Sequence, residues 1–442
     1  MKKILVIGAG RSAVILIKYL LDNSKLNNWQ VTVADFSKDL AEQAIDNHIN
    51  GKAIFFNVTD DKQRLSEISE ADIVISMLPA TMHITVAKDC VKLKKNLVTA
   101  SYVSNEILEL DIFAKKAGVL LLNEIGVDPG IDHMSAMAVI NDIKDRGGEL
   151  TSFKSFCGGL VHPDYDNNPW NYKFTWNPRN VVLAGQGTAQ YIQEGRYKYL
   201  PYSKLFERTN FVDILDAGKF EGYANRDSLS YREAYGIESI PTLYRGTLRR
   251  KGYAEGWNIF VQLGMTNDCF KLENSENISN REFLNMFLPY SNDLSVEEKL
   301  CEQFNFTIDS VFFKRIAWLG MFDDTIIGVK DASPAQLLQA ILEQKWTLDS
   351  KDKDMLVMQH QFEFILDGKI NKLNSSLLVF GDDSRNTAMA KTVGLPVAIA
   401  TKLILNGQIR SKGVKIPTSK DIYMPILKEL SENGINFIDE LV

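Results

Sequence analysis

The chain is poor in cysteine, has no basic tract and has no long hydrophobic run. Its four cysteines in 442 residues are scattered and lack metal-type pair spacing, which excludes a disulfide-built secreted domain. We therefore expect a reducing, cytoplasmic location. A net charge of −6 without a Lys/Arg cluster argues against nucleic acid as a partner. No apolar run reaches the roughly 18 residues of a membrane span, so we expect no membrane partner.

The rest of the composition is that of an ordinary globular protein. Hydrophobic residues make up 45% of the sequence and charged residues 24%. At this length the chain should hold two or three domains, each able to bury its own core. We find no internal repeat and no low-complexity segment.

The first 35 residues carry the most information. An apolar run at 4–7 leads into a glycine-rich turn, a helical apolar pattern follows, and a second apolar run at 31–34 ends at an acid. This is the order of a dinucleotide-binding βαβ (Rossmann) unit. Gly8 permits the tight turn, Gly10 lets the backbone approach a pyrophosphate, and Ala13 allows close helix packing. The turn therefore predicts a cofactor site made of Gly8, Ala9, Gly10, Arg11, Ser12 and Ala13.

The acid after the second run is Asp35, and it bears on the choice of cofactor. Its carboxylate suits the two ribose hydroxyls of NAD and would repel the 2′-phosphate of NADP. No arginine follows it directly, so NAD is favoured. NADP stays possible, because Lys38 or Arg11 could serve a phosphate.

Further strands are expected at 53–56, 71–76, 96–102 and 118–123, which continues an α/β doubly wound sheet. Ligands bind beyond the carboxyl ends of such strands, so the polar loop at Asn57 and Val58 is expected near the adenine. The alternation fades after residue 130. Strand-like segments then mix with loops, residues 280–350 are mainly helical, and an apolar helix at 387–405 is expected to return to the first domain.

Asp128 follows the last of these strands and has two readings. Beside apolar neighbours and a nicotinamide ring, its carboxylate could exchange a proton with a substrate amine. Alternatively, Val-Asp-Pro-Gly is simply a good turn sequence. Asp132 and His133 nearby could suggest a metal, but a helix N-terminus explains the acids, and we expect no metal.

Cys157, followed by two glycines, is expected at a strand end where a ligand could approach. The alternative is a small buried thiol, the commoner fate of a free cysteine. His48, His83 and His360 are interpreted as packing or surface residues. The arginine-bearing segments 225–228 and 245–249 suit bidentate binding of carboxylates, although surface charge is the usual role of any one arginine.

With these segments in view, the chain resembles the glutamate-forming saccharopine dehydrogenases, also called saccharopine reductases. The similar blocks run almost end to end and are long and unusual. They are GAGRSA at 8–13, VISMLPATMH at 74–83, NEIGVDPGIDH at 123–133, SFCGGL at 155–160, NPWNYKFTW at 168–176, NRDS at 225–228, RGTLR at 245–249, DMLVMQH at 354–360 and TVGLPVAIATK at 392–402.

The resemblance implies a three-part architecture. A Rossmann domain at 1–130 is completed by about 387–442. A mixed α/β domain at 131–280 and 351–386 binds substrate and supports a homodimer, and a small helical part spans 281–350. The implied reaction interconverts saccharopine, NAD(P)⁺ and water with glutamate, 2-aminoadipate 6-semialdehyde and NAD(P)H. Hydride leaves the carbon beside a secondary amine, and water hydrolyses the resulting imine.

The resemblance also implies roles for residues in the matching blocks. Asp128, Cys157 and Tyr102 are the acid–base candidates, without an assignment of which proton each takes. The implied substrate contacts are Ser101, Tyr102, Asp128, Arg226, Thr247, Leu248 and Arg249. The implied cofactor contacts, besides the glycine turn and Asp35, are Leu78, Thr99, Val127, Asp128, Pro129 and Thr175.

The sequence departs from the family pattern at one position, and two alternative functions stay open. The NADP-using biosynthetic members lack an acid at the place of Asp35, which leaves open the cofactor and whether the enzyme makes or degrades lysine. The first rival is a related imine reductase such as carboxynorspermidine dehydrogenase. The second is a nicotinamide-responsive binding protein without turnover.

Overall fold

The computed structural model describes all residues from Met1 to Val442, and they form two compact units. Unit 1 comprises Met1–Leu150, Phe364–Asn371 and Leu377–Glu440. Unit 2 comprises Thr151–Glu363, Lys372–Ser376 and Leu441–Val442.

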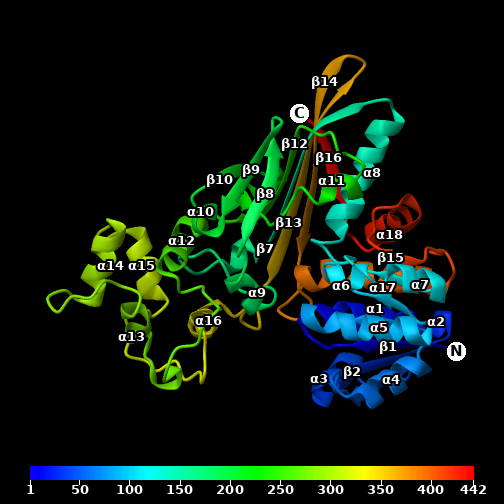
Figure 1. The fold of residues 1–442 in the computed structure, drawn as a ribbon, viewed down its shortest axis with the longest axis horizontal. Coiled ribbons are helices and arrows are strands. Elements are labelled where there is room, and N and C mark those ends of the chain that lie inside the picture. The colour runs from blue at the N-terminus through cyan, green and yellow to red at the C-terminus, as the bar shows by residue number, and fades with distance from the viewer. The chain divides into compact units, whose positions relative to one another are not determined.

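Unit 1 is built on a seven-stranded parallel sheet (Figure 1). Strand β1 lies between β2 and β4, so the strand order reverses there, which is where doubly wound folds bind ligands. In spatial order the strands are β15 (Gly413–Lys415), β6 (Leu120–Leu122), β5 (Asn96–Val98), β4 (Ile73–Ser76), β1 (Lys2–Ile7), β2 (Trp29–Asp35) and β3 (Gly51–Phe55).

Helices cover this sheet, and β1 is apolar throughout its inner part because both of its faces are buried: Ile4 to Ile7 are all at most 2% exposed. Helices α1 and α17 pack on each other, and α4 packs on α5. The helices of unit 1 are η1 (Arg11–Ala13), α1 (Val14–Asp22), α2 (Ser24–Asn27), α3 (Lys38–Ile45), α4 (Asp61–Glu70), η2 (Ala80–Met82), α5 (His83–Leu93), α6 (Asn105–Leu108), α7 (Asp111–Ala117), α8 (Ile131–Asp145), α17 (Ala388–Leu405) and α18 (Lys420–Glu432).

The C-terminal segment completes the Rossmann sheet, as expected. Strand β15 pairs in parallel with β6, and α17 lies against α1 so closely that a Cβ on Gly394 would stand 2.9 Å from the Leu16 nitrogen. Helix α17 is the one helix long and apolar enough to cross a membrane, with a mean hydropathy of 1.5, although 78% of it is buried. The sequence predicted an apolar helix at 387–405 that returns to the first domain, and α17 is that helix.

Unit 2 carries most of a nine-stranded mixed sheet. Strand β12 runs parallel to β7 and antiparallel to β11, and β8 forms a hairpin with β9. The strands are β10 (Thr209–Asp213), β11 (Lys219–Ala224), β12 (Thr242–Arg249), β7 (Glu149–Val161), β13 (Asp354–Leu366), β14 (Lys369–Phe380), β16 (Phe437–Leu441), β8 (Thr188–Gln193) and β9 (Arg196–Pro201).

The helical part of unit 2 begins its helices with clear sequence signals. Ser279, Ser295 and Ser333 each accept a backbone amide at a helix start, and each is answered by Glu or Gln three residues on. The helices of unit 2 are η3 (Pro163–Tyr165), α9 (Pro178–Val182), α10 (Tyr202–Leu205), η4 (Leu215–Ala217), α11 (Tyr231–Ala234), α12 (Tyr253–Leu263), η5 (Ser275–Asn277), α13 (Asn280–Asn285), α14 (Val296–Phe304), α15 (Val311–Trp318) and α16 (Pro334–Trp346).

The expected domain limits differ from this division at three places. Residues 364–371 and 377–386, expected in the mixed α/β domain, fall within unit 1. Helix α8 belongs to unit 1 because it packs on α18, where Asn141 donates to the Tyr423 hydroxyl at 2.7 Å. The helical stretch 281–350, expected as a part of its own, falls within unit 2.

Candidate functional site

The glycine turn after β1 has the geometry of a phosphate-binding loop. Gly8 has φ = +105°, and a Cβ there would stand 2.8 Å from the Met77 carbonyl oxygen, so both conformation and space require glycine. A Cβ on Gly10 would meet nothing within 4 Å, which leaves open space over the backbone at this turn. Ala13 is buried, Ser12 half-buried and Arg11 exposed. The turn therefore fits a dinucleotide pyrophosphate.

Asp35, at the end of β2, stabilises the glycine turn through hydrogen bonds. Its Oδ2 accepts the Ala9 amide at 2.7 Å and its Oδ1 accepts the Ser37 amide at 2.8 Å. The carboxylate is half-exposed, so further lone pairs can receive ribose hydroxyls. Two exposed rings flank it, Phe36 and Phe55, with centroids 5.4 Å apart. The sequence analysis did not identify these rings. Their positions were a usable signal, because Phe36 directly follows β2 and Phe55 is the last residue of β3.

The loop after β3 is held by its own polar atoms. The Asn57 side-chain oxygen accepts the Thr59 amide at 3.0 Å and the Thr59 hydroxyl at 2.8 Å. Asn57 and Val58 are both half-buried at the carboxyl end of the sheet. The contact of this loop with an adenine stays a prediction.

The exit of β4 is joined to the loop after β5 through a histidine. His83 Nδ1 lies 2.8 Å from Ser76 Oγ, and His83 Nε2 lies 2.7 Å from Ser101 Oγ. Burial lowers the pKa of His83 to about 4. The interpretation of His83 as a packing residue was incomplete, because it also bonds two hydroxyls. Thr99 is buried and Leu78 half-buried at the same strand exits.

Two loops bring the acid–base candidates of unit 1 together. The Tyr102 hydroxyl donates to Asp128 Oδ1 at 3.4 Å, and both side chains are half-buried. The bond from Asp128 to Pro129 is cis. Glu124 ties the loops, since its Oε1 accepts the Val103 amide at 3.0 Å and its Oε2 lies 2.8 Å from His133 Nε2.

Asp132 has a local structural role. Its Oδ1 accepts the amides of Gly130 at 2.6 Å and His133 at 2.8 Å at the start of α8. Val127 and Pro129, on either side of Asp128, are buried. The loop thus presents the Asp128 carboxylate on a fixed backbone.

In unit 2, Cys157 lies inside β7 and not at a strand end, which corrects the expectation. Its register partner on β12 is Thr247. The glycine that follows serves strand packing, because a Cβ on Gly158 would stand 2.5 Å from the Leu248 carbonyl oxygen. Side chains alternate along a strand, so Thr247 and Arg249 share one face of β12 and Leu248 points to the other. On the face that carries Thr247 and Arg249, only the backbone of Leu248 can make contacts. The Leu248 side chain is fully buried on the other face.

Arg249 is the most unusual side chain of unit 2. It is 3% exposed, and its guanidinium carbon lies 5.0 Å from the ring centre of Tyr172 and 5.4 Å from that of Tyr253. Its Nη1 donates to the Leu248 carbonyl at 2.8 Å, while Nε is buried without a hydrogen-bond partner. Burial opposes the charge, but Tyr223, Tyr172 and Tyr253 raise the pKa of Arg249, so the cation persists.

The remaining predicted contacts of unit 2 differ in exposure. Thr175 is 3% exposed, and its hydroxyl is buried without a hydrogen-bond partner. Arg226 is exposed on a left-handed turn with φ = +49°, and its carbonyl accepts the Gln190 amide at 2.9 Å.

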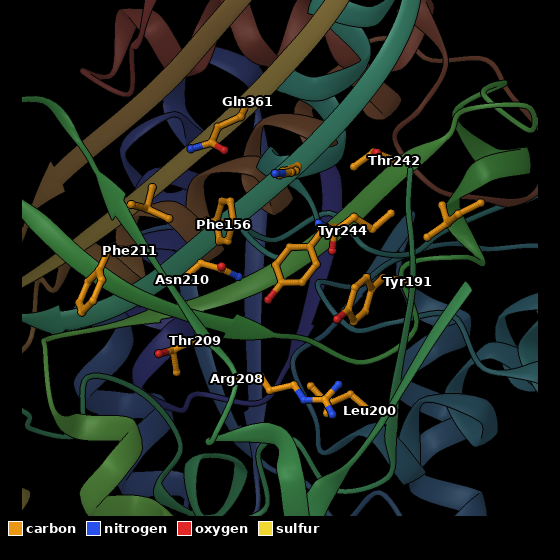
Figure 2. A pocket seen from close by; sticks show the side chains of 14 residues that line it. Phe156, Tyr191, Leu200, Arg208, Thr209, Asn210, Phe211, Thr242, Tyr244 and Gln361 are labelled. Carbon is orange, nitrogen blue, oxygen red and sulfur yellow. The ribbon is translucent and has the colours of Figure 1, made fainter. Parts of the chain in front are cut away.

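A cavity of about 520 Å³ opens on the other face of this sheet (Figure 2). Phe156 and Tyr244 line it, and they alternate with Cys157 and Thr247 along their strands, so the cavity is separate from the Arg249 face. Phe211, 53% exposed, stands at its edge.

The parallel sheet, its glycine turn and the acid after β2 define an NAD(P)-dependent oxidoreductase with a second, mixed-sheet unit. Family models agree: residues 4–122 match the saccharopine dehydrogenase NADP binding domain, and residues 126–435 match the saccharopine dehydrogenase C-terminal domain. The chain belongs to the saccharopine dehydrogenase family.

Individual relatives cover the chain almost completely. Saccharopine dehydrogenase [NADP(+), L-glutamate-forming] of Saccharomyces cerevisiae is 35% identical over 98% of this chain and 97% of its own length. The structure of the apo, histidine-tagged yeast enzyme (L-Glu forming) matches with a TM-score of 0.89 and 34% identity over the whole of both chains. Mitochondrial alpha-aminoadipic semialdehyde synthase of Rattus norvegicus is 35% identical over 99% of this chain. The chain spans 47% of that synthase's length.

Proposed function

We propose that this protein is a glutamate-forming saccharopine dehydrogenase of lysine metabolism. It interconverts saccharopine, the oxidised nicotinamide cofactor and water with L-glutamate, L-2-aminoadipate 6-semialdehyde and the reduced cofactor. The observation that carries the proposal is the buried Arg249, a persistent cation whose Nε lacks a protein partner. A buried cation without an anionic partner is stabilised when an anion binds, and saccharopine carries three carboxylates.

Substrate carboxylates are bound by hydroxyls and cations. Arg249 provides a planar donor set in a dry pocket, where a charge-assisted hydrogen bond is strongest. Thr247, on the same strand face, adds a hydroxyl, and Arg226 adds an exposed cation. In unit 1, Ser101 and Tyr102 supply hydroxyls.

A bound nicotinamide would supply the hydride acceptor for the carbon that bears the secondary amine. The amine proton must leave as the C=N bond forms, and water then adds before the C–N bond breaks. Asp128, hydrogen-bonded to Tyr102, is suited to take and return such protons, and the Cys157 thiol is the third candidate. Leu78, Thr99, Val127, Pro129 and Thr175 would contact the cofactor.

We propose that NAD is preferred over NADP. Both Asp35 oxygens accept backbone amides, so the carboxylate is held in place, and its charge would repel the 2′-phosphate of NADP. The exposed Phe36 and Phe55 rings offer apolar surface for the adenine.

A steady-state assay tests the reaction. Saccharopine with NAD or NADP should produce reduced nicotinamide, followed by its absorbance, with NAD giving the higher kcat/KM. Glutamate should accumulate in equal amount. If neither cofactor is reduced while carboxynorspermidine is oxidised, the imine-reductase rival replaces this proposal. If cofactor binds but no candidate substrate turns over, the binding-protein rival does.

We also propose a homodimer formed through unit 2. Phe211 is 53% exposed on the edge strand β10, beside the aromatic cavity, and aromatic residues are enriched in interfaces (Figure 2). Sedimentation should give about twice the monomer mass for the wild type, and Phe211→Glu should lower it. Phe113→Glu, a 58% exposed phenylalanine of unit 1, is the matched control. A monomeric wild type contradicts the dimer.

A cytoplasmic location is proposed from the chemistry of the thiols. No disulfide joins the four cysteines, and Cys90 and Cys157 are buried. Reduced thiols are stable in a reducing compartment. Cell fractionation with an antibody to the chain tests the location, and recovery with an organelle contradicts it.

A further inference from the structure

His83 is placed to control the direction of a hydroxyl in the substrate site. It is the first residue of α5 and 1% exposed, and its two ring nitrogens contact two serines from different segments. Ser76 ends β4, and Ser101 belongs to the loop after β5. No acid contacts the ring, so the chain Ser76–His83–Ser101 is made of uncharged groups.

The imidazole is neutral at physiological pH, because burial holds the pKa of His83 at about 4. A neutral imidazole has one N–H donor and one acceptor nitrogen. The two serines must therefore play opposite roles: one hydroxyl donates to the ring, and the other accepts from it.

The backbone of Ser101 is already fixed. Its amide donates to Thr99 Oγ1 at 3.3 Å, and its carbonyl accepts the Glu124 amide at 3.0 Å. The side-chain torsion and the hydroxyl hydrogen of Ser101 are not fixed by these two backbone bonds. His83 Nε2, 2.7 Å from Ser101 Oγ, sets the direction of that hydrogen.

We propose that His83 is a positioning residue, which holds the Ser101 hydroxyl as a hydrogen-bond donor toward a substrate carboxylate. Ser76 donates to Nδ1, Nε2–H donates to Ser101 Oγ, and the Ser101 hydrogen is left for the anion. A chain of donors that all point one way strengthens each bond. This inference rests on the proposed function, because it takes a carboxylate as the ligand of Ser101.

Two substitutions separate the two ends of the chain. His83→Asn retains an amide near Nδ1 and loses the contact with Ser101, so the KM for saccharopine should rise about tenfold. The cofactor KM and kcat should stay within about threefold. His83→Gln places an amide N–H near Nε2 and should recover part of the loss. His48→Asn, also in unit 1, is the control and should leave both KM values unchanged.

A double-mutant cycle with Ser101→Ala tests whether His83 acts through Ser101. The double variant His83→Asn/Ser101→Ala should have the saccharopine KM of Ser101→Ala alone. Multiplied effects, equal rises in both KM values, or a normal KM in His83→Asn would each overturn the inference. Melting curves identify any variant that fails to fold.

A spectroscopic measurement keeps this test independent of turnover. In ¹⁵N-histidine-labelled protein, the five histidines should include one whose Nε2 carries the proton and whose shifts do not change between about pH 5.5 and 8. That signal should be absent in His83→Gln. Protonation at Nδ1 instead overturns the inference even if saccharopine is turned over. An inactive wild type with the expected tautomer contradicts the proposed function alone.

Discussion

Two buried cations of unit 2 have the same exposure and opposite surroundings. Lys173 and Arg249 are each 3% exposed. The Lys173 ammonium lies 2.6 Å from Asp352 Oδ2 and 3.5 Å from Asp349 Oδ2. Arg249 has aromatic rings and a carbonyl around it and no carboxylate in an ion pair.

The difference separates a structural cation from a ligand-binding one. Lys173 and Asp352 neutralise each other inside the protein, and Asp352 also accepts the Asp349 amide at 2.7 Å. Their interaction is complete without a ligand. Arg249 keeps an unused donor in a dry site, so its strongest partner must come from outside the chain. The comparison predicts that Lys173 affects folding and Arg249 affects substrate.

The largest effect is expected at Lys173. Lys173→Met leaves the Asp352 carboxylate buried and unpaired, which should lower the free energy of unfolding by about 3–5 kcal/mol. Chemical denaturation measures it. The folded variant should keep the KM for saccharopine within about twofold.

A second variant provides the control for Lys173. Lys173→Met/Asp352→Leu removes both charges and should recover most of the lost stability. If Lys173→Met remains as stable as the wild type but loses substrate affinity, Lys173 is part of the substrate site and the comparison fails.

Arg249→Met should act on catalysis instead. Losing a desolvated donor to a carboxylate should lower kcat/KM for saccharopine about 100-fold, chiefly through KM. The free energy of unfolding should stay within about 1 kcal/mol, because a buried cation is replaced by an apolar chain. Steady-state kinetics and denaturation are measured on the same preparation.

The neighbouring residue gives a matched control for Arg249. Arg250 directly follows the end of β12, and its guanidinium carbon lies 4.7 Å from the ring centre of Phe220. Arg250→Met should change kcat/KM less than threefold. Equal effects of the two substitutions would mean that the loss reflects net charge and not a specific carboxylate contact.

The dinucleotide unit was largely predictable from local sequence. The glycine turn, the apolar strand before it and Asp35 lie within 35 residues, so their spacing alone defines the motif. The C-terminal completion of the sheet was also predicted, from the resemblance and from the apolar pattern of 387–405.

What the sequence could not show depends on residues far apart in the chain. The cage of Arg249 comes from Tyr172 and Tyr253 on separate segments, and no local pattern indicates that the cation lacks an acid. The place of α8 in unit 1 depends on Asn141 and Tyr423, 282 residues apart. The strand-end position expected for Cys157 was wrong because glycine also serves close packing between strands.

Asp35 extends to unit 1 the comparison between ionic groups that are paired within the protein and those that bind a ligand. Backbone amides hold its carboxylate, which is still open to a ligand. Asp35→Ser removes the charge that opposes a 2′-phosphate. The ratio of kcat/KM for NADP to that for NAD should rise about thirtyfold. Asp39→Asn, an exposed acid at the start of α3, is the control and should leave the ratio unchanged. An unchanged ratio in Asp35→Ser would remove Asp35 from cofactor selection.

The smallest effect is expected at Thr175. Thr175 and Thr242 repeat, with uncharged hydroxyls, the comparison between a buried group without a partner and one with a partner. Its buried hydroxyl has no partner, whereas Thr242 Oγ1 accepts the Glu194 amide at 3.0 Å. Thr242→Val should therefore cost about 1 kcal/mol of stability and leave kinetics unchanged. Thr175→Val should cost no stability and raise the KM for the cofactor about fivefold, because the hydroxyl finds its partner only in the bound complex. A loss of stability in Thr175→Val with an unchanged KM would contradict this prediction. It would show that a buried polar group without a partner does not mark a ligand contact in this protein. The proposal that Arg249 binds a substrate carboxylate would then lose support as well.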